Sequence, residues 1–326
     1  MFKPILIGAG LLCGAAMLPA HAAEPDAKYP SKVIRLVVPF APGGSTDIVA
    51  RIIAEPLREE LGQTVIVDNR PGAGGNIGGD IVAKAAPDGY TLLMAAAGQI
   101  AINPSLYTKM SYDPARDLTA VTMIARDYNM MAVNASLPVK NVREFVAYAR
   151  AHPDRITFGS PGNGSVAQLA GELMNRSTGL KMQHVPYKGS GPAVADLIAG
   201  HITLMIDNMP AIWPHVQSGK LRALAVTSEK RAPGAPDVPT AEEAGLKGYV
   251  VPAWKGVMAP ANTPRPIVDK LNHALVRVLA RPEIRKRLIE QGAEPVGNTP
   301  EQFAQQIKTD TAWWAALVKS TGTTLD

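Results

Sequence analysis

An apolar run, a glycine loop and a helical pattern follow one another near the start of the chain, and this order restricts the fold more than any other feature. Val33–Val38 reads VIRLVV, which is typical of a parallel strand covered on both faces. The loop PFAPGGSTD follows, and apolar residues then recur with helical spacing from Ile48 to Leu61. Two further strands are expected at Thr64–Asn69 and Tyr90–Ala97. This βαβαβ order predicts an α/β fold with a doubly wound, mostly parallel sheet.

A second series of strands and helices follows a crossover region at Leu118–Asn134. Asn141 and Glu144 have the spacing of a capping box, which opens the first helix of this series. Four strands are then expected, with helices between them: Arg155–Ser160, Met182–Tyr187, Ile202–Asp207 and Leu221–Thr227. The series predicts a second α/β unit of similar size.

The C-terminal part of the chain is expected to return to the first unit. Tyr249–Pro260 has strand character, and Thr263 and Thr299 each precede a proline that opens an amphipathic helix. Because these helices bring no new sheet, we expect them to pack on the first unit and make it discontinuous. The predicted organisation is lobe 1 at residues 24–125 plus 246–326, lobe 2 at residues 126–245, and a hinge of two crossings.

Length and charge agree with two domains and argue against a nucleic-acid partner. The chain has 326 residues, of which 46% are hydrophobic, and single cores stop growing near roughly 250–300 residues. The net charge of +5 is mild for this length. The only dense basic block, Arg281–Leu288, also contains Glu283 and is interpreted as a solvated helix face. We therefore expect no nucleic-acid binding.

The first 23 residues have the pattern of a cleaved signal peptide. Lys3 precedes an apolar run from Ile5 to Leu18, and the small residues of Ala20–Ala22 follow at the expected cleavage site. We therefore expect export to the periplasm. The only cysteine, Cys13, lies within this segment, so the mature chain would have no disulfide, thiolate metal site or cysteine nucleophile.

Two glycine loops share one design, and each is expected between a strand and a helix. FAPGGSTD follows the first strand, and GSPGNGSVAQ follows the first strand of the second unit, where Ser165 and Gln168 form a capping box. The first N–H groups of a helix and its dipole favour an anion. One such loop per lobe suits a ligand with two acidic groups, or one acidic group held from both sides. The alternative is a pair of ordinary βα turns with good caps.

The spacing of glycine, serine and histidine residues does not match the motifs of nucleotide-binding, hydrolase or metal sites. GAGGNIG at residues 72–78 is not G-x-G-x-x-G and follows the second strand, and neither a P-loop nor a G-x-S-x-G elbow is present. The histidines lack metal-ligand spacing. We therefore expect no metal and no cofactor.

Taken together, several segments resemble the Bug-type, or tripartite tricarboxylate transporter, solute-binding receptors. They include YPSKVIRLVVPFAPGGSTDIVAR, VDNRPGAGGNIGGDIVAKAAPDGYTLL, FGSPGNGS, VPYKGSGPAVADLIAGHI and WKGVMAPANTP, and the match covers essentially the whole mature chain in order. The resemblance implies a periplasmic binding protein of two α/β lobes, of the Venus-flytrap type. It also implies a small carboxylate ligand, which can be a di- or tricarboxylate, an acidic amino acid or an aromatic acid. The implied partner is a membrane permease or a sensor kinase, and we expect a monomer.

The same resemblance implies which residues bind the ligand. The family pattern puts the carboxylate on the first loop, with a contribution from the second loop and from the end of the third strand. Ordered waters often bridge the ligand in this family. The residues that match the pattern are Phe40, Ala41, Pro42, Gly43, Gly44, Ser45 and Thr46, then Ser160, Gly162, Gly164 and Ser165, and finally Gly98 and Gln99.

Four further residues are candidates with open alternatives. Lys188, preceded by Tyr187, either meets a second carboxylate or is a solvated loop lysine. Asp207 either accepts an ammonium group of the ligand or caps the following helix. Lys255 follows Trp254 on the returning strand, so at most one of the two side chains points into the cleft. A lysine facing the cleft would favour extra negative charge on the ligand.

The predicted function is therefore a receptor without catalytic residues that closes on its ligand by hinge motion. One alternative keeps the binding function but makes the chain a periplasmic sensor for a two-component system. Another is an exported enzyme acting on a carboxylate, for which Ser165 and Asp207 near a cleft are the support. The identity of the acid is not predicted.

Overall fold

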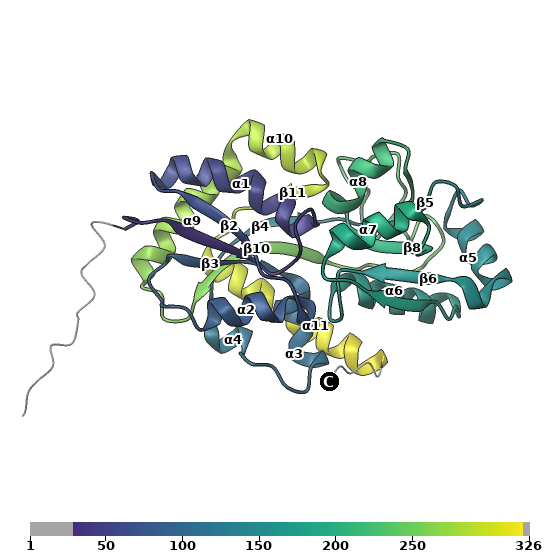
Figure 1. Ribbon diagram of the computed structural model, residues 1–326, viewed down its shortest axis with the longest axis horizontal. Coiled ribbons are helices and arrows are strands. Elements are labelled where there is room, and N and C mark those ends of the chain that lie inside the picture. Colours follow the sequence, from purple (N-terminus) through teal and green to yellow (C-terminus); the bar gives the residue numbers. More distant parts are fainter. Residues whose placement is uncertain (1–28, 322–326) are drawn as a thin grey trace, which may run out of the picture.

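Two β-sheets organise the chain in the computed structural model, which describes residues 29–321 (Figure 1). The first has the order β11-β4-β10-β3-β1-β2 and the second β7-β6-β8-β5-β9. The strands of the first sheet are β1 (Ile34–Val38), β2 (Val65–Asn69), β3 (Thr91–Ala96), β4 (Leu118–Asp127), β10 (Ala253–Pro260) and β11 (Ala293–Pro295). Those of the second are β5 (Asn129–Asn134), β6 (Thr157–Ser160), β7 (Gln183–Pro186), β8 (Leu204–Asn208) and β9 (Leu221–Val226). The expected signal peptide lies outside the described residues.

Helices cover both sheets and connect most of the strands. In the first lobe they are α1 (Ser45–Leu61), α2 (Asn76–Ala83), α3 (Asn103–Leu106), α4 (Pro114–Asp117), α9 (Arg265–Ala280), α10 (Pro282–Glu290) and α11 (Pro300–Thr321). In the second they are α5 (Val142–Ala151), α6 (Val166–Thr178), α7 (Ser190–Ala199) and α8 (Met209–Gln217). Single 3₁₀ turns lie at Ala73–Gly75 and Pro153–Arg155, and a π-helical segment lies at Gly98–Ile102. No helix among residues 29–321 combines the length and the apolar composition that a membrane span needs.

The two α/β lobes agree with the prediction, but each sheet is mixed rather than mostly parallel. β1 pairs in parallel with β2 and β3, and β6 with β7 and β8. β10 is antiparallel to β3 and β4, and β5 is antiparallel to β8 and β9. The reason is the hinge: β5 and β10 enter their lobes from it and run away from the cleft, whereas their neighbours run towards it.

The chain crosses between the sheets twice. β4 ends at Asp127 and β5 begins at Asn129, so Tyr128 alone separates the two sheets at the first crossing. The expected crossover region thus consists of two long strands. The return runs from the end of β9 to the start of β10, and Tyr249 on it donates a hydrogen bond to the Ala170 carbonyl of α6. The domain boundaries at 125/126 and 245/246 remain predictions.

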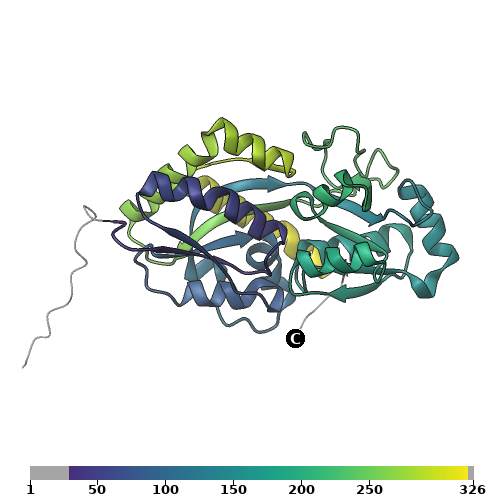
Figure 2. The same ribbon diagram turned by 45° about the horizontal axis from the view of Figure 1, so that its top comes forward.

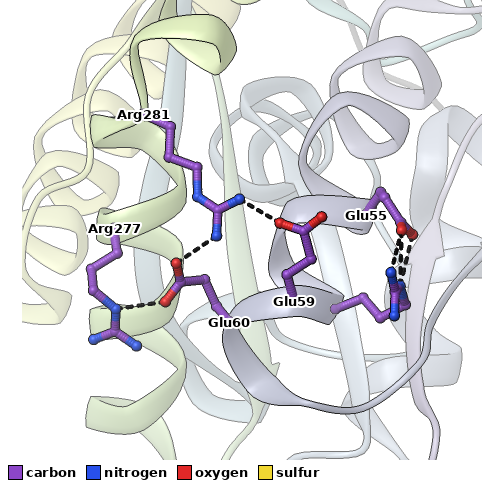
Figure 3. A network of polar contacts seen from close by, with 6 residues as sticks. Glu55, Glu59, Glu60, Arg277 and Arg281 are labelled. Atoms are coloured by element: carbon purple, nitrogen blue, oxygen red, sulfur yellow. Dashed lines mark hydrogen bonds and ion pairs between the residues drawn. The ribbon is translucent and has the colours of Figure 1, made fainter.

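Segments far apart in the sequence cover the first sheet. Apolar residues of α1, α9 and α10 form one core with β1 and β3, and α2 and α11 pack on the other face (Figure 2). Ion pairs join the C-terminal end of α1 to the end of α9 and to Arg281, which lies between α9 and α10: Arg281 contacts Glu59 and Glu60 at 2.6 Å, and Arg277 contacts Glu60 at 2.7 Å (Figure 3). The N-terminal and C-terminal segments therefore build one lobe.

Candidate functional site

The N-termini of four helices meet at one small cavity between the lobes. α1, α6, α7 and α8 follow the carboxyl ends of β1, β6, β7 and β8, where α/β sheets place their ligand crevice. Ser45 of α1 comes from the first lobe, whereas Ser165, Ser190 and Asn208 begin the helices of the second lobe. The cavity has a volume of about 30 Å³. First-turn N–H groups have no intrahelical acceptor, so this convergence favours negative charge.

The first glycine loop uses some of its own N–H groups to hold its shape. Gly43 adopts a φ of 77° and donates its N–H to the Asp47 carboxylate at 2.9 Å, and Gly44 donates to the Ala41 carbonyl at 3.4 Å. Of the expected residues, Phe40, Ser45 and Thr46 line the cavity.

The middle of the first loop lies against the second lobe instead. Ala41 donates its N–H to the Lys188 carbonyl at 3.1 Å. The Pro42 carbonyl lies 2.8 Å from the place where a side chain on Gly191 would begin. Ala41, Pro42, Gly43 and Gly44 therefore do not line the cavity, but they fix how the lobes meet.

The second glycine loop is held by its own side chains. Ser165 accepts the Gln168 N–H at 3.2 Å, which confirms this half of the predicted capping box. The Gln168 side chain accepts the N–H of Gly164 at 2.7 Å, one residue before the N-cap. Ser160 accepts the Gly162 N–H at 3.2 Å, and its hydroxyl lies 2.6 Å from His184 Nε2. Ser165 lines the cavity, whereas Ser160, Gly162 and Gly164 support the loop.

Gly98 is one of the points at which the first lobe touches the second loop. A Cβ on Gly98 would lie 3.0 Å from the Gly164 carbonyl oxygen, so glycine allows this close approach without a shift of the second loop. Gln99 was expected to belong to the ligand site, but its side chain is fully buried and does not line the cavity. The π-helical segment at Gly98–Ile102 instead directs its amide against Gly75, in the turn before α2, and against Gly79 within α2.

Asp207 is the one ionisable side chain that lines the cavity among the described residues. It accepts hydrogen bonds from the Ser190 hydroxyl and, at 2.8 Å, from the Asn208 N–H. Burial raises the pKa of its carboxyl to about 6, although these two hydrogen bonds and Lys255 oppose the shift. The expected cap of α8 is absent, because Asp207 binds the residue before that helix and not its first turn. Its carboxyl nevertheless lies beside the starts of α7 and α8, whereas no acidic side chain of the described residues lines the cavity at α1 or α6.

Lys255 corrects another expectation, because it is wholly buried and does not line the cavity. Its ammonium pairs with Asp127 at the end of β4 and donates to Asn208 Oδ1 at 3.2 Å. Trp254 lines the cavity instead, and its indole N–H donates to Asp310 at 2.7 Å. Strand alternation thus separates the two residues as predicted, with the aromatic one facing the cleft.

Asn208 is a contact between the lobes that the sequence reading missed. Its Oδ1 accepts from the Ser45 hydroxyl of the first lobe at 3.1 Å and from Lys255. Its amide donates to Asn129 at the start of β5. In the sequence, the feature that could have indicated this role is the position of Asn208 directly after Asp207, at the end of a predicted strand. Asn208 connects α1, both crossings and α8.

Tyr187 and Lys188 lie beside a second interlobe cavity of about 200 Å³, which Phe40 separates from the first. Neither residue lines the first cavity.

Among the described residues that line the first cavity, Ser190 and Asp207 form one hydroxyl–carboxyl pair, and the other polar groups are hydroxyls, an amide, an indole and backbone groups. No histidine lines it, and the Ser165 hydroxyl accepts from its own helix. The Ser160–His184 pair lies outside it, with Ser160 fully buried. No group of three or more histidine, cysteine or acidic side chains within residues 29–321 could hold a metal ion.

Comparisons with known proteins agree with this geometry. Residues 49–323 match the family model described as the tripartite tricarboxylate transporter family receptor. A solved structure of Rpa4515 from R. palustris with adipate is 41% identical, covers 91% of this chain and 99% of its own, and superposes with a TM-score of 0.88. The periplasmic binding protein BugD is 38% identical with the same coverage and TM-score. MatC from Rhodopseudomonas palustris with bound malate is 37% identical, with coverage of 89% and 100% and a TM-score of 0.85.

Proposed function

The chain belongs to the tripartite tricarboxylate transporter receptors, a family of periplasmic solute-binding proteins, and we propose that it binds a small carboxylate between its lobes. The observation that carries the proposal is that α1 and α6 point their N-termini into one cavity from opposite lobes. Relatives of known structure hold adipate and malate, which supports the same ligand class here. The ligand carboxylate takes the positions in front of Ser45, Thr46 and Ser165.

Binding and closure are one process in this proposal. A cavity of about 30 Å³ has room for no more than a few water molecules, so the lobes must move apart before an acid can enter. The carboxylate first meets the N–H groups at the start of α1, and hinge rotation then brings α6 to its other side. The closed state is favoured by the difference in ligand affinity between the two states. Ordered water completes the hydrogen bonds that the protein leaves unmade.

We propose that the chain binds the acid in the periplasm and delivers it to a membrane permease. The receptor family and the expected signal peptide support this location and this partner. Delivery to a sensor kinase is the alternative output. Capture of membrane partners by the acid-loaded chain, followed by their identification, separates the two.

A thermal-shift screen of the mature chain, from Ala23 onward, tests the binding proposal. The panel holds malate, adipate, citrate, malonate, succinate, glutamate, aspartate, nicotinate and terephthalate, with neutral sugars as controls. An acid at 100 times its dissociation constant should stabilise the fold by about 2.7 kcal/mol. Stabilisation by sugars alone, or by none of the acids, would contradict the proposal. Recovery of the bound acid unchanged after incubation separates a receptor from an enzyme.

Ser45→Asp is the matching variant, because it places a carboxylate at the start of α1, where the ligand's would lie. An acidic first turn favours the helix dipole, so the variant should fold. Its response to acids should disappear, whereas Ser31→Asp, with the same charge at an exposed position of the same lobe, should respond like the parent. If Ser45→Asp is stabilised by acids as the parent is, the binding site does not lie at the start of α1.

A further inference from the structure

A third cavity lies at the hinge, away from the helix starts that surround the first cavity. Its volume is about 440 Å³, which is in the range of sites for small organic molecules. β4, β10, β11 and α11 line it from the first lobe, and the segment that follows β9 lines it from the second lobe. We call it the hinge cavity.

Both points at which the chain crosses between the lobes line the hinge cavity. Tyr128 is the one residue between β4 and β5. On the return, Val251 is tied to the second lobe, because its N–H donates to the Thr227 carbonyl at 2.9 Å, whereas Ala253 already belongs to β10. Pro252, between them, is therefore the second pivot. Hinge motion turns the chain at Tyr128 and Pro252, so it changes the shape of this cavity.

The interior of the hinge cavity combines apolar side chains with a buried acid. Met123, Val251 and Trp254 supply the apolar surface, and each is 3% exposed. Asp310 of α11 is 8% exposed and accepts hydrogen bonds from the Trp254 indole at 2.7 Å and from the Gln306 amide at 2.9 Å. Both donors are neutral, so they leave the charge of the carboxylate uncompensated.

No ion pair within residues 29–321 compensates that charge. Burial raises the pKa of the Asp310 carboxyl, although its two hydrogen bonds and the more distant charge of Arg126 oppose the shift. Glu294, the half-buried acid of the cavity, accepts the Tyr128 hydroxyl at 3.1 Å. The remaining charged residues of the lining are exposed or already paired: Arg126, Glu229, Lys230 and Asp127, which pairs with Lys255. The buried part of the cavity therefore favours a positive charge.

We propose that the hinge cavity is an effector site for a small organic cation, an amine whose ammonium pairs with Asp310 and whose apolar body lies against Trp254. An ammonium close to the face of an indole ring is stabilised further by the ring electrons. The lobes are in contact in this structure, so an occupant that fits the cavity favours the closed conformation.

The effector site is coupled to the first cavity through Trp254, which lines both. Coupling between two sites is reciprocal, so an amine that favours closure should raise the affinity for the acid, and the acid should raise the affinity for the amine. This effect on acid affinity rests on the proposed function, whereas binding of the amine and closure of the lobes do not.

Isothermal titration calorimetry with matched amines and alcohols tests the site without any acid. The pairs are phenethylamine and 2-phenylethanol, tyramine and tyrosol, and hexylamine and hexanol. Each is titrated into the parent chain, Asp310→Asn and Asp237→Asn. Asp237 is exposed and does not line the cavity, so its variant controls for net charge. At least one amine should bind the parent about tenfold or more tightly than its alcohol, and Asp310→Asn should remove that difference.

Val250→Trp is a second variant, which leaves Asp310 unchanged. Val250 is half-buried and lines the hinge cavity, so an indole at this position occupies the space of the effector. This variant should bind none of the amines.

Small-angle X-ray scattering measures the effect on closure. Without any acid, a saturating concentration of the amine that binds should reduce the radius of gyration of the parent, and the same concentration of its alcohol should not. The dissociation constants of adipate and malate, measured by calorimetry, should fall at least about fivefold in the presence of that amine.

Four results would overturn the inference. Equal affinity for amines and alcohols, or no binding by either, would show that the cavity is not a cation site. The same loss in Asp237→Asn as in Asp310→Asn, or unchanged amine binding by Val250→Trp, would place the amine elsewhere. An amine that weakens the binding of adipate or malate would lie in the first cavity, beside Asp207. An amine that binds without reducing the radius of gyration would not be an effector of closure.

Failure of the proposed function gives a different result. Amines would then bind and close the lobes, but no acid would bind with or without them.

Discussion

Asp207 places a carboxyl group in a cavity that we propose receives another carboxylate. Two ionised carboxylates at close range repel each other, so one of them favours the protonated form. The raised pKa of Asp207, about 6, means that this residue takes up the proton easily. Its hydrogen bonds from Ser190 and Asn208 hold it in place in either state.

Asp207 should make the stability of the protein depend on pH between about 4 and 6. The folded pKa lies above the ordinary value of 3.8, so the folded chain binds this proton more tightly than the unfolded chain. The contribution of Asp207 to stability is therefore complete below pH 4 and falls as the pH rises through 6. Relative to Asp207→Asn, the free energy of unfolding should fall by up to about 3 kcal/mol over this range.

Urea denaturation of the parent and Asp207→Asn at pH 4, 5, 6 and 7 measures this difference. Asp237→Asn, at an exposed position, is the control and should follow the parent. A constant difference between the parent and Asp207→Asn at all four pH values would contradict the account.

Lys255 should prove to be a structural residue of the hinge and not a ligand contact. Its removal in Lys255→Met leaves the buried Asp127 carboxylate without a counter-charge, which should cost about 3–5 kcal/mol of unfolding free energy. Asp127→Leu combined with Lys255→Met removes both charges and should recover much of that loss. Urea denaturation of the parent, the single variants and the double variant gives the unfolding free energies for a double-mutant cycle.

The double variant also tests the ligand site, because it should still be stabilised by the acids that stabilise the parent. If the double variant folds but is no longer stabilised by any acid, Lys255 contributes to ligand binding.

At the residue scale, sequence reading succeeded where the determining contacts are local. The Ser165–Gln168 capping box involves residues three apart, and it is present as predicted. Lys255 was misplaced because its partner Asp127 lies 128 residues away in the sequence and on the other crossing. Gln99 was misplaced because the π-helical segment after β3 has no sequence signature in the residues that form it.

At the scale of elements, the glycine turns control how closely the lobes approach. Gly74, in the turn before α2, has a φ of 61°, and a Cβ there would lie 2.0 Å from the Asn163 carbonyl of the other lobe. Because this neighbour is backbone, it cannot move aside as a side chain would.

Gly74→Ala should therefore impair closure, and Gly62→Ala separates closure from backbone strain. Gly62 has a similar φ of 66° but no atom within 4 Å of an added Cβ. Both variants should lose stability to a similar extent, about 1–2 kcal/mol, from the left-handed conformation. Only Gly74→Ala should bind adipate or malate at least about tenfold more weakly, as measured by calorimetry. Equal affinities for the two variants would show that this contact does not limit closure.

The helices and most strands could be predicted from periodicity, but their meeting points could not. The starts of α1 and α6 were recognised from their glycine loops, whereas those of α7 and α8 were not identified as part of the cavity. Their convergence depends on the pairing of β7 and β8 with β6 and on the position of the lobes. The short strand β11 was missed, since three residues carry too little pattern to be recognised.

For the whole molecule, the two crossings explain why the site lies where it does. The first lobe is built from both ends of the chain and is held by ion pairs between α1, α9 and α10, so it can act as one body during hinge motion. The order of the strands along the chain predicted two lobes, but the antiparallel pairing at the hinge required the structure. The side-chain bond from Ser45 to Asn208 then joins the lobes across the cavity.

The central claim is that one carboxylate is held between the N-termini of α1 and α6, and a crystal structure of the mature chain with adipate or malate tests it most directly. The account predicts carboxylate oxygens within about 2.7–3.2 Å of first-turn N–H groups from both helices, directly or through one water, with the lobes in contact. It also predicts that Lys255 stays paired with Asp127. An acid bound to one lobe alone would contradict it, and so would an acid in the separate hinge cavity of about 440 Å³ that Tyr128 of the first crossing and Asp310 of α11 line.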